Sequence, residues 1–126
     1  MTNNKIDKLQ NKIKIQFTDQ EILKQSLIHK SFSSKKNNEK LEFLGDRVLG
    51  LILSKKLLEI FPNDKEGIID KKFANLVNKK TCLAIGQSIN LKEFMTLGGS
   101  YKGHSRSDEK IISDCLEALI GAIFID

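Results

Sequence analysis

Apolar residues recur at helical spacing along most of the chain, and no long segment alternates apolar and polar residues as a strand would. The pattern therefore predicts an all-α fold. Residues 97–107 hold three of the eight glycines and predict an exposed loop before the last helix. We expect helices over five segments: 19–29, 38–61, 68–77, 81–89 and 108–126.

Several residues mark the ends of these predicted helices. Thr18 and Glu21 have the spacing of a capping box at the start of the first helix. Asn38 is placed to cap the second helix, and Pro62 ends it because the residue before a proline avoids the helical conformation. We also expect Thr81 to cap the short helix that follows it.

The second and the last predicted helices are apolar in nearly every direction, a pattern typical of buried helices. Both nevertheless carry acids at spacings that place them on one stripe: Glu39, Glu42 and Asp46, and then Asp114 and Glu117. Carboxylates rarely enter a core unless they are paired or bind a metal, and like charges at this spacing require a positive charge between them. The pattern predicts an oxygen-ligand site for a hard cation such as Mg²⁺ or Mn²⁺. The alternative is that these acids lie on the solvent-facing edges of two ordinary helices.

The charge is distributed unevenly along the 126 residues, whose net charge is +5. Residues 1–36 hold eight lysines and three acids, whereas residues 37–126 hold thirteen bases and thirteen acids. A basic segment joined to a neutral body favours a polyanionic partner such as nucleic acid, although lysine-rich solvated faces are common.

Nothing in the sequence indicates a membrane protein or a disulfide scaffold. The apolar stretches are too short to span a bilayer, and the polar N-terminus has no signal-peptide pattern. Cys82 and Cys115 lie in no metal-binding motif and are expected to be free, buried thiols in a reducing compartment. We therefore expect a single cytoplasmic domain.

Residues 38–49, NEKLEFLGDRVL, resemble the signature box of the ribonuclease III catalytic domain. Residues 26–32 and 110–126 are similar to the first helix and the second acidic helix of that family, and the resemblance covers residues 10–126. It implies an all-helical bundle, with residues 1–126 as the catalytic domain, that acts as a homodimer without an organic cofactor. Bacterial relatives continue beyond the point that matches residue 126 with a further helix and a double-stranded-RNA-binding domain.

The family resemblance also implies an activity. It is that of an endoribonuclease that uses Mg²⁺, with Mn²⁺ as a substitute, to hydrolyse double-stranded RNA during the processing of ribosomal and messenger RNA. The products carry 5′-phosphate and 3′-hydroxyl ends with a short 3′ overhang. Two alternatives are a non-catalytic RNA-binding or ribosome-associated domain of the same fold and a purely structural helical module. The first usually lacks the metal-site acids, and the second leaves them unexplained.

Roles for individual residues follow from the same resemblance. Glu39 matches an acid that contacts the substrate, Glu66 resembles an acid near the dimer-related site, and Phe43 matches an aromatic residue that inserts into a pocket of the partner subunit. The catalytic and metal-site carboxylates are matched by Glu42, Asp46, Asp114 and Glu117.

The remaining polar candidates have simpler interpretations. His29 is expected to pack or cap at the end of the first helix, and His104 is a loop residue with at most a contact to RNA phosphate. Lys102, Arg106 and Lys110 lie in or beside the glycine-rich loop, where they either contact phosphates or are simply solvated.

Overall fold

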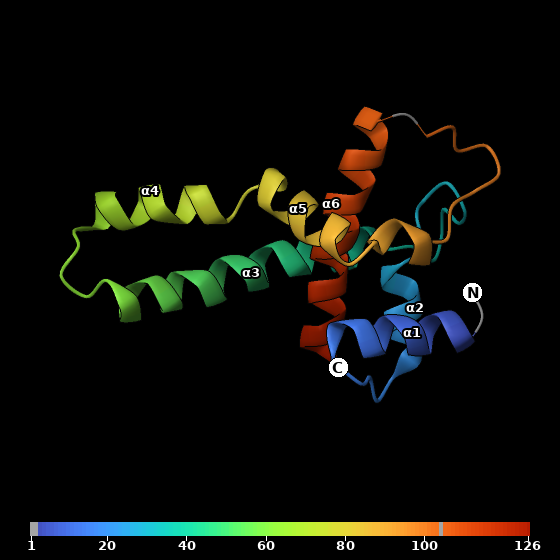
Figure 1. Cartoon of the computed structure of the whole chain (residues 1–126), viewed down its shortest axis with the longest axis horizontal. Helices are drawn as coiled ribbons and strands as arrows, with labels where there is room; N and C mark the ends of the chain where they lie inside the picture. The colour runs from blue at the N-terminus through green and yellow to red at the C-terminus, as the bar shows by residue number, and fades with distance from the viewer. Residues whose placement is uncertain (1–2, 104) are drawn as a thin grey trace.

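The computed structural model describes residues 3–103 and 105–126, and within these ranges the fold is all-α, as predicted (Figure 1). The only extended pairing among the described residues is an isolated bridge between Ile28 and Thr96. The helices are, in order, α1 (Asn3–Ile13), α2 (Gln20–Ser26), α3 (Glu39–Ile60), α4 (Glu66–Leu76), α5 (Lys79–Ser88), the short 3₁₀ helix η1 (Leu91–Phe94) and α6 (Ser105–Ile125).

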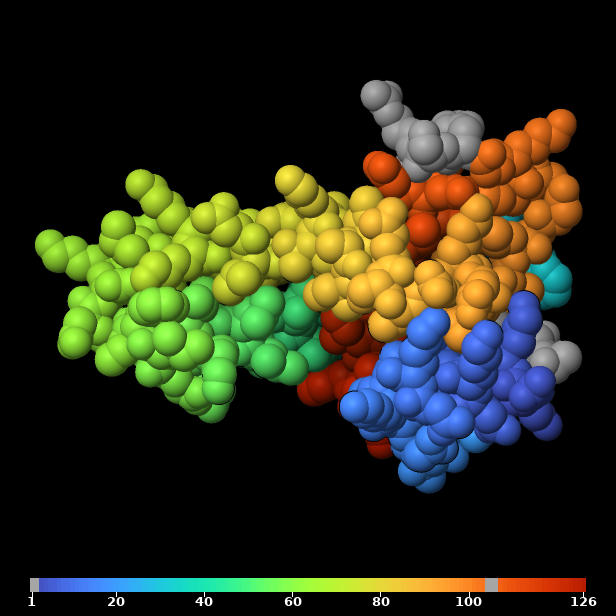
Figure 2. Space-filling view, in the orientation of Figure 1, coloured from blue at the N-terminus to red at the C-terminus, as the bar shows by residue number. Residues whose placement is uncertain are grey.

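The helices form two regions, which we call the body and the arm. The body contains α1, α2, α5, η1, α6 and the first part of α3, and the arm is the outer part of α3 with α4 folded back along it (Figure 1). In the space-filling view the arm projects to one side of the body (Figure 2). The core therefore lies in the body, around α6.

The body is centred on a close crossing of α3 and α6. A Cβ atom added to Gly45 would lie 1.6 Å from the carbonyl oxygen of Glu117, and one added to Gly121 would lie 2.3 Å from the carbonyl oxygen of Leu41. Glycine is needed at both positions because the two backbones approach too closely for any side chain. This approach brings the first turns of α3 against the middle of α6.

Apolar side chains from every helix of the body cover α6. The core includes Ile6 and Leu9 of α1, Leu23 of α2, Phe94 of η1 and, on α6 itself, Leu119. Cys82 and Cys115 are both buried and free, which confirms the expectation for the thiols. No helix in the described part of the chain is both long and apolar enough to cross a bilayer.

The arm contradicts the expectation that the helix over 38–61 is buried on every side. Beyond the crossing with α6, Leu51 is 72% exposed, and Ile52, Leu58 and Ile60 are also exposed. The fourth helix, α4, has no fully buried residue. The helical pattern was correct, but one neighbouring helix cannot cover all sides of α3.

Two predicted helix caps were wrong, and the third, Asn38, occupies the N-cap position of α3 without making the side-chain capping hydrogen bond. Asp19, not Thr18, caps α2 by accepting a hydrogen bond from the backbone N–H of Glu21. Asn37 accepts the hydrogen bond from the backbone of Glu39 at the start of α3. Asn78, not Thr81, caps α5.

The predicted side-chain cap, Asn38, has a different role. Its side chain donates a hydrogen bond to the carbonyl oxygen of Ser26 and so ties the start of α3 to the end of α2. Helix α2 ends at Ser26, before the predicted residue 29, because His29 donates its backbone N–H to the carbonyl oxygen of Thr96.

The helix α1 was missed, and the start of α6 lies three residues before the predicted residue 108. Ile6, Leu9 and Ile13 of α1 have helical spacing, so a pattern for this helix was present.

Candidate metal centre

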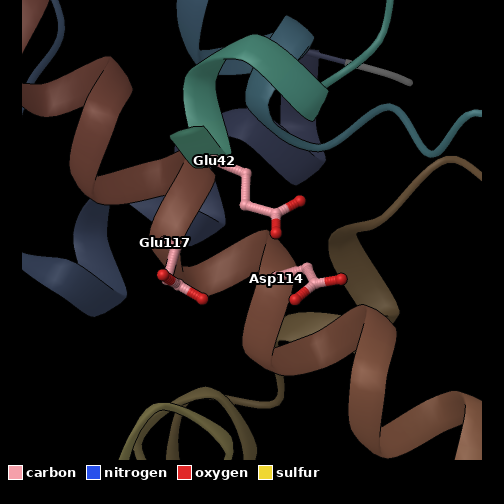
Figure 3. A group of neighbouring side chains, drawn as sticks. All are labelled: Glu42, Asp114 and Glu117. Atoms are coloured by element: carbon pink, nitrogen blue, oxygen red, sulfur yellow. The ribbon is translucent and has the colours of Figure 1, made fainter. Parts of the chain in front are cut away.

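Three carboxylates meet where α3 crosses α6. Glu42 extends from the first turns of α3, and Asp114 and Glu117 extend from adjacent turns of α6 (Figure 3). One oxygen from each lies within 4.8 Å of the others. The stripe on each helix aligns its acids, and the glycine crossing brings the two stripes together.

The cluster is buried at one end and open at the other. The side chain of Glu117 is only 4% exposed, that of Asp114 is mostly buried, and that of Glu42 lies nearer the surface. On the open side, a cavity of about 300 Å³ is lined by Glu42, Glu117, other charged side chains and the ring of Phe43. A phosphate group from solution can therefore approach the acids from this side.

A lysine that sequence analysis did not select lies among these acids. Lys79, the first residue of α5, places its Nζ atom 2.6 Å from Oδ1 of Asp114 and 3.7 Å from Oε1 of Glu42, and it donates a hydrogen bond to Glu117. Lys110 binds the other oxygen of Asp114 at 2.6 Å. The structure thus supplies the positive charge that the spacing of the acids required.

The acids differ in how readily they ionise. Burial and the neighbouring carboxylate of Asp46 raise the pKa of Glu117, whereas the charge of Lys79 lowers it. The net result is a pKa of about 6. Burial and the charge of Asp114 also raise the pKa of Glu42. Burial alone would raise the pKa of Asp114 as well, but hydrogen bonds from Lys110 and Lys79 outweigh burial and lower it. Asp114 is therefore the most firmly ionised acid of the three.

Asp46 and Glu39 lie at the edge of the cluster rather than within it. The side chain of Asp46 is 53% exposed, and its Oδ2 lies 3.3 Å from Nη1 of Arg47. Both acids line the open cavity with Glu42, and Asp46 also lines a smaller cavity beside Glu117. Of the predicted acids, the structure clusters three, places Asp46 beside Glu117 at the rim, and leaves Glu39 on the wall of the open cavity.

Phe43 and Glu66 lie farther from the acids. Phe43 is 62% exposed at the rim of the open cavity, with the guanidinium of Arg47 3.8 Å from the centre of its ring. Glu66 begins α4 at the outer end of the arm, away from α6 (Figure 1). Within one chain, Glu66 is not brought to the cluster.

The histidine predictions gave one testable result. His29 packs its ring edge-on against Tyr101, with 5.6 Å between ring centroids, and its Nδ1 lies 2.7 Å from the hydroxyl of Ser31. The ring therefore packs, as predicted, but it lies three residues beyond the end of α2 and against a residue of the glycine-rich loop. Lys102 is exposed, whereas His104 and the side chain of Arg106 lie outside the described part of the chain.

Comparison with known proteins identifies close relatives of the chain. A family model described as ribonuclease-III-like matches residues 19–126. The chain is 56% identical to ribonuclease 3 of Pelagibacter ubique over 119 residues, covering 94% of this chain and 54% of that protein. It is 42% identical to ribonuclease 3 of Actinobacillus pleuropneumoniae over 122 residues, covering 96% of this chain and 54% of that protein. The chain therefore spans about half the length of the curated relatives that it matches.

The fold is similar to solved nuclease domains. Two structures of the nuclease domain of ribonuclease III from Campylobacter jejuni each have a TM-score of 0.86 and 39% sequence identity. The first match covers 95% of this chain and 85% of the solved chain, and the second covers 99% of this chain and 84% of the solved chain. One of them is described for structural flexibility in a region involved in dimer formation.

Proposed function

The chain belongs to the ribonuclease III family, and from this premise we propose that it is the catalytic domain of a metal-dependent endoribonuclease acting on double-stranded RNA. The reaction hydrolyses phosphodiesters and leaves 5′-phosphate and 3′-hydroxyl ends with a short 3′ overhang. The observation that carries this proposal is the cluster of Glu42, Asp114 and Glu117, two of which, Glu42 and Glu117, line an open cavity.

The donor set fits a hard divalent cation. Its ligands are carboxylate oxygens only, drawn from two helices that the glycine crossing holds in place. The open side leaves room for water and a phosphate oxygen, which Mg²⁺ usually retains in its coordination shell. When bound there, Mg²⁺ or Mn²⁺ would lower the pKa of the attacking water and stabilise charge on the phosphate and the departing 3′ oxygen.

The chain's own residues have separate tasks in this proposal. Glu117 and Asp114, held on the buried helix α6, fix the position of the ligand oxygens. Asp46, which lines the open cavity with Glu42 and Glu117, would add a fourth carboxylate to the set. Neither cysteine acts as a nucleophile, because burial raises the pKa of both thiols and keeps them protonated.

Substrate binding is assigned to basic side chains and surface shape. Lys30, Lys35 and Lys36 are exposed in the segment between α2 and α3, within the basic part of the sequence. Duplex RNA is recognised mainly through its backbone, its 2′-hydroxyls and its shape, so we expect weak sequence preference. We assign this activity to the cytoplasm, since buried free thiols suit a reducing compartment.

We further propose that two chains act together as a homodimer. The arm exposes Leu51, Ile52 and Leu58 on one helix, and contiguous exposed apolar residues mark association surfaces. The exposed ring of Phe43 would enter a pocket of the second copy, and Glu66 would serve that copy's site. A dimer accounts for an apolar arm that a monomer leaves in water.

Incubation of the purified chain with a short RNA duplex, with and without Mg²⁺, tests the function. On a denaturing gel we expect cuts in the duplex only when Mg²⁺ or Mn²⁺ is present, and no cuts in the separate single strands. Duplex binding without cleavage in either metal would instead support the non-catalytic RNA-binding alternative.

A further inference from the structure

Lys79 places a positive charge inside a cluster of acids that is suited to bind a divalent cation. Its Nζ atom contacts one oxygen of each clustered acid: Oε1 of Glu42 at 3.7 Å, Oδ1 of Asp114 at 2.6 Å, and Oε1 of Glu117. A Mg²⁺ ion bound by these carboxylates would lie about 2.0–2.1 Å from its ligand oxygens. The ammonium and such an ion would therefore compete for the same space and the same oxygens.

We propose that Lys79 holds the three carboxylates together in the metal-free state and must withdraw its ammonium before a divalent cation can bind. The inference rests on the metal site proposed above and concerns what sets the metal affinity of that site. Without a cation between them, three adjacent acids would repel one another and loosen the crossing of α3 and α6. Lys79 supplies that charge from within the chain.

The position of Lys79 allows its ammonium to leave without disturbing the core. Lys79 is the first residue of α5, directly after the capping residue Asn78, and its side chain is 60% exposed. A long, flexible lysine stem on the surface can rotate its ammonium into water while the helix stays in place. Withdrawal therefore requires breaking ion pairs but no unpacking of apolar side chains.

Lys110 provides an internal contrast. It binds Oδ2 of Asp114 from the next turn of α6, whereas Lys79 binds Oδ1 from a different helix. No contact between Lys110 and Glu42 or Glu117 occurs among the ion pairs of the described residues. Lys110 therefore neutralises one acid from outside, and only Lys79 lies where the three acids converge.

Competition of this kind has a measurable consequence. The apparent dissociation constant of a metal equals its intrinsic value divided by the fraction of molecules whose site is free to bind. If Lys79 is withdrawn in about a tenth of the molecules, removing its ammonium tightens metal binding about tenfold. The carboxylates would at the same time lose their internal counter-charge, so the metal-free protein would become less stable.

Calorimetric titration with Mn²⁺ alone, without RNA, tests the proposal. We expect Lys79→Met to bind Mn²⁺ at least about fivefold more tightly than the parent chain, on the competition argument above. The matched control is Lys80→Met, which removes the same charge one residue away from an exposed position. Its affinity should remain within about twofold of the parent, which separates local competition from a general field effect.

Thermal unfolding provides a second readout. In EDTA, Lys79→Met should melt at a lower temperature than the parent, and Mn²⁺ should raise its melting temperature by more than it raises that of the parent. If Lys79→Met does not fold in EDTA, Lys79→Gln replaces it, because a neutral amide can still donate a hydrogen bond to Glu117. The same tighter binding is expected from that variant.

The outcomes separate this inference from the proposed function. If Glu117→Gln loses Mn²⁺ binding while Lys79→Met binds no more tightly than the parent, the metal site stands and the competing role of Lys79 is overturned. If neither the parent nor Lys79→Met binds Mn²⁺, or if Glu117→Gln binds it as the parent does, the carboxylate site itself is wrong and both proposals fall.

Discussion

The last helix and the outer part of α3 are both rich in apolar residues, yet they have different surroundings. On α6, residues such as Cys115, Ala118 and Leu119 are buried by helices on several sides. On the outer part of α3, Leu51 and Leu58 face water, and α4 covers only one side. Similar composition has thus produced a core helix in the body and an exposed helix in the arm.

Apolar side chains therefore have different roles in the body and in the arm. In the body, apolar residues stabilise the fold and hold the carboxylates of Glu42, Asp114 and Glu117 at a fixed crossing. In the arm, they contribute little to the folded monomer and are available for association with another surface. A substitution should therefore change stability and the metal site in the body but association in the arm.

Substitutions at two glycines of α3 should show the largest difference in stability between the body and the arm. An alanine at Gly45, in the body, would place its Cβ against the backbone of Glu117, so we expect Gly45→Ala to lower the free energy of unfolding by about 3 kcal/mol or more. An alanine at Gly50, in the arm, meets only the ring of Phe73 at 3.5 Å. Gly50→Ala should therefore be neutral or stabilise by up to about 1 kcal/mol through its higher helix propensity.

Urea unfolding followed by circular dichroism, at one fixed chain concentration, measures both glycine variants. Equal losses of stability at the two positions would contradict the distinction between body and arm.

Phe43 lies in the first turns of α3, on the body, but its ring is exposed as the apolar side chains of the arm are, so a change there should alter association rather than folding. If the exposed ring fills a pocket of a second copy, Phe43→Ala should weaken dimerisation by about 3–5 kcal/mol, the cost of emptying an aromatic site. Phe32, which is similarly exposed but lies in the segment between α2 and α3, provides the control. Sedimentation equilibrium should show a weaker dimer for Phe43→Ala alone, and an unchanged affinity would remove this role from Phe43.

The body should show a pH dependence that originates at Glu117. Its carboxyl group must lose its proton to bind a metal, and burial raises its pKa to about 6. At subsaturating Mn²⁺, the apparent affinity should therefore fall as the pH drops through about 6, by up to roughly tenfold per pH unit below that value. Calorimetric titrations across this range measure the effect. A constant affinity down to the ordinary carboxyl range near pH 4.5 would contradict the raised pKa.

The smallest expected effect concerns the exposed lysines of the body. If Lys30, Lys35 and Lys36 contact phosphates, replacing each by Gln should lower the slope of log affinity against log salt by about one unit per lost contact. Lys55→Gln, on the arm, is the control because Lys55 is paired with Glu59 at 2.5 Å. Gel-shift titrations at several salt concentrations give the slopes, and an identical slope for all variants would make these lysines ordinary surface residues.

Sequence patterns predicted five of the helices and the stripe of acids on each of two of them, because these features depend on spacing within a single helix. The stripes holding Glu42 on α3 and Asp114 on α6 are local features, and the family resemblance indicated that they face each other. The position of Lys79 is not local. It depends on the turn between α4 and α5, which brings Lys79 beside an acid 35 residues later in the chain.

Other differences between the predicted and the observed structure also arise from contacts between distant parts of the chain. Apolar spacing cannot distinguish a side chain that faces a core from one that faces another molecule, so the exposure of Leu51 was not predictable from its pattern. The choice between Asn37 and Asn38 as the cap of α3 depends on where the end of α2 lies, because Asn38 binds Ser26 instead. The boundaries of α2 and α3 thus depend on tertiary contacts that no local pattern contains.

The central claim is that the carboxylates between α3 and α6 carry out the chemistry while other surfaces bind the RNA. Asp46→Asn and Glu117→Gln retain side-chain size and each remove one charge from the proposed site. Each should reduce duplex cleavage in Mg²⁺ by orders of magnitude, because metal binding and water activation both depend on these charges. Duplex affinity should stay within a few fold of the parent, because it depends mainly on basic side chains.

Parallel cleavage gels and gel shifts on one RNA duplex make this measurement, with Glu109→Gln, an exposed acid on α6, as the control. The account predicts binding without cleavage for Asp46→Asn and Glu117→Gln, partial recovery of Glu117→Gln in extra Mn²⁺, and a parent-like rate for Glu109→Gln. Cleavage by Asp46→Asn and Glu117→Gln at the parent rate in Mg²⁺ would contradict the carboxylate metal site and the nuclease mechanism built on it.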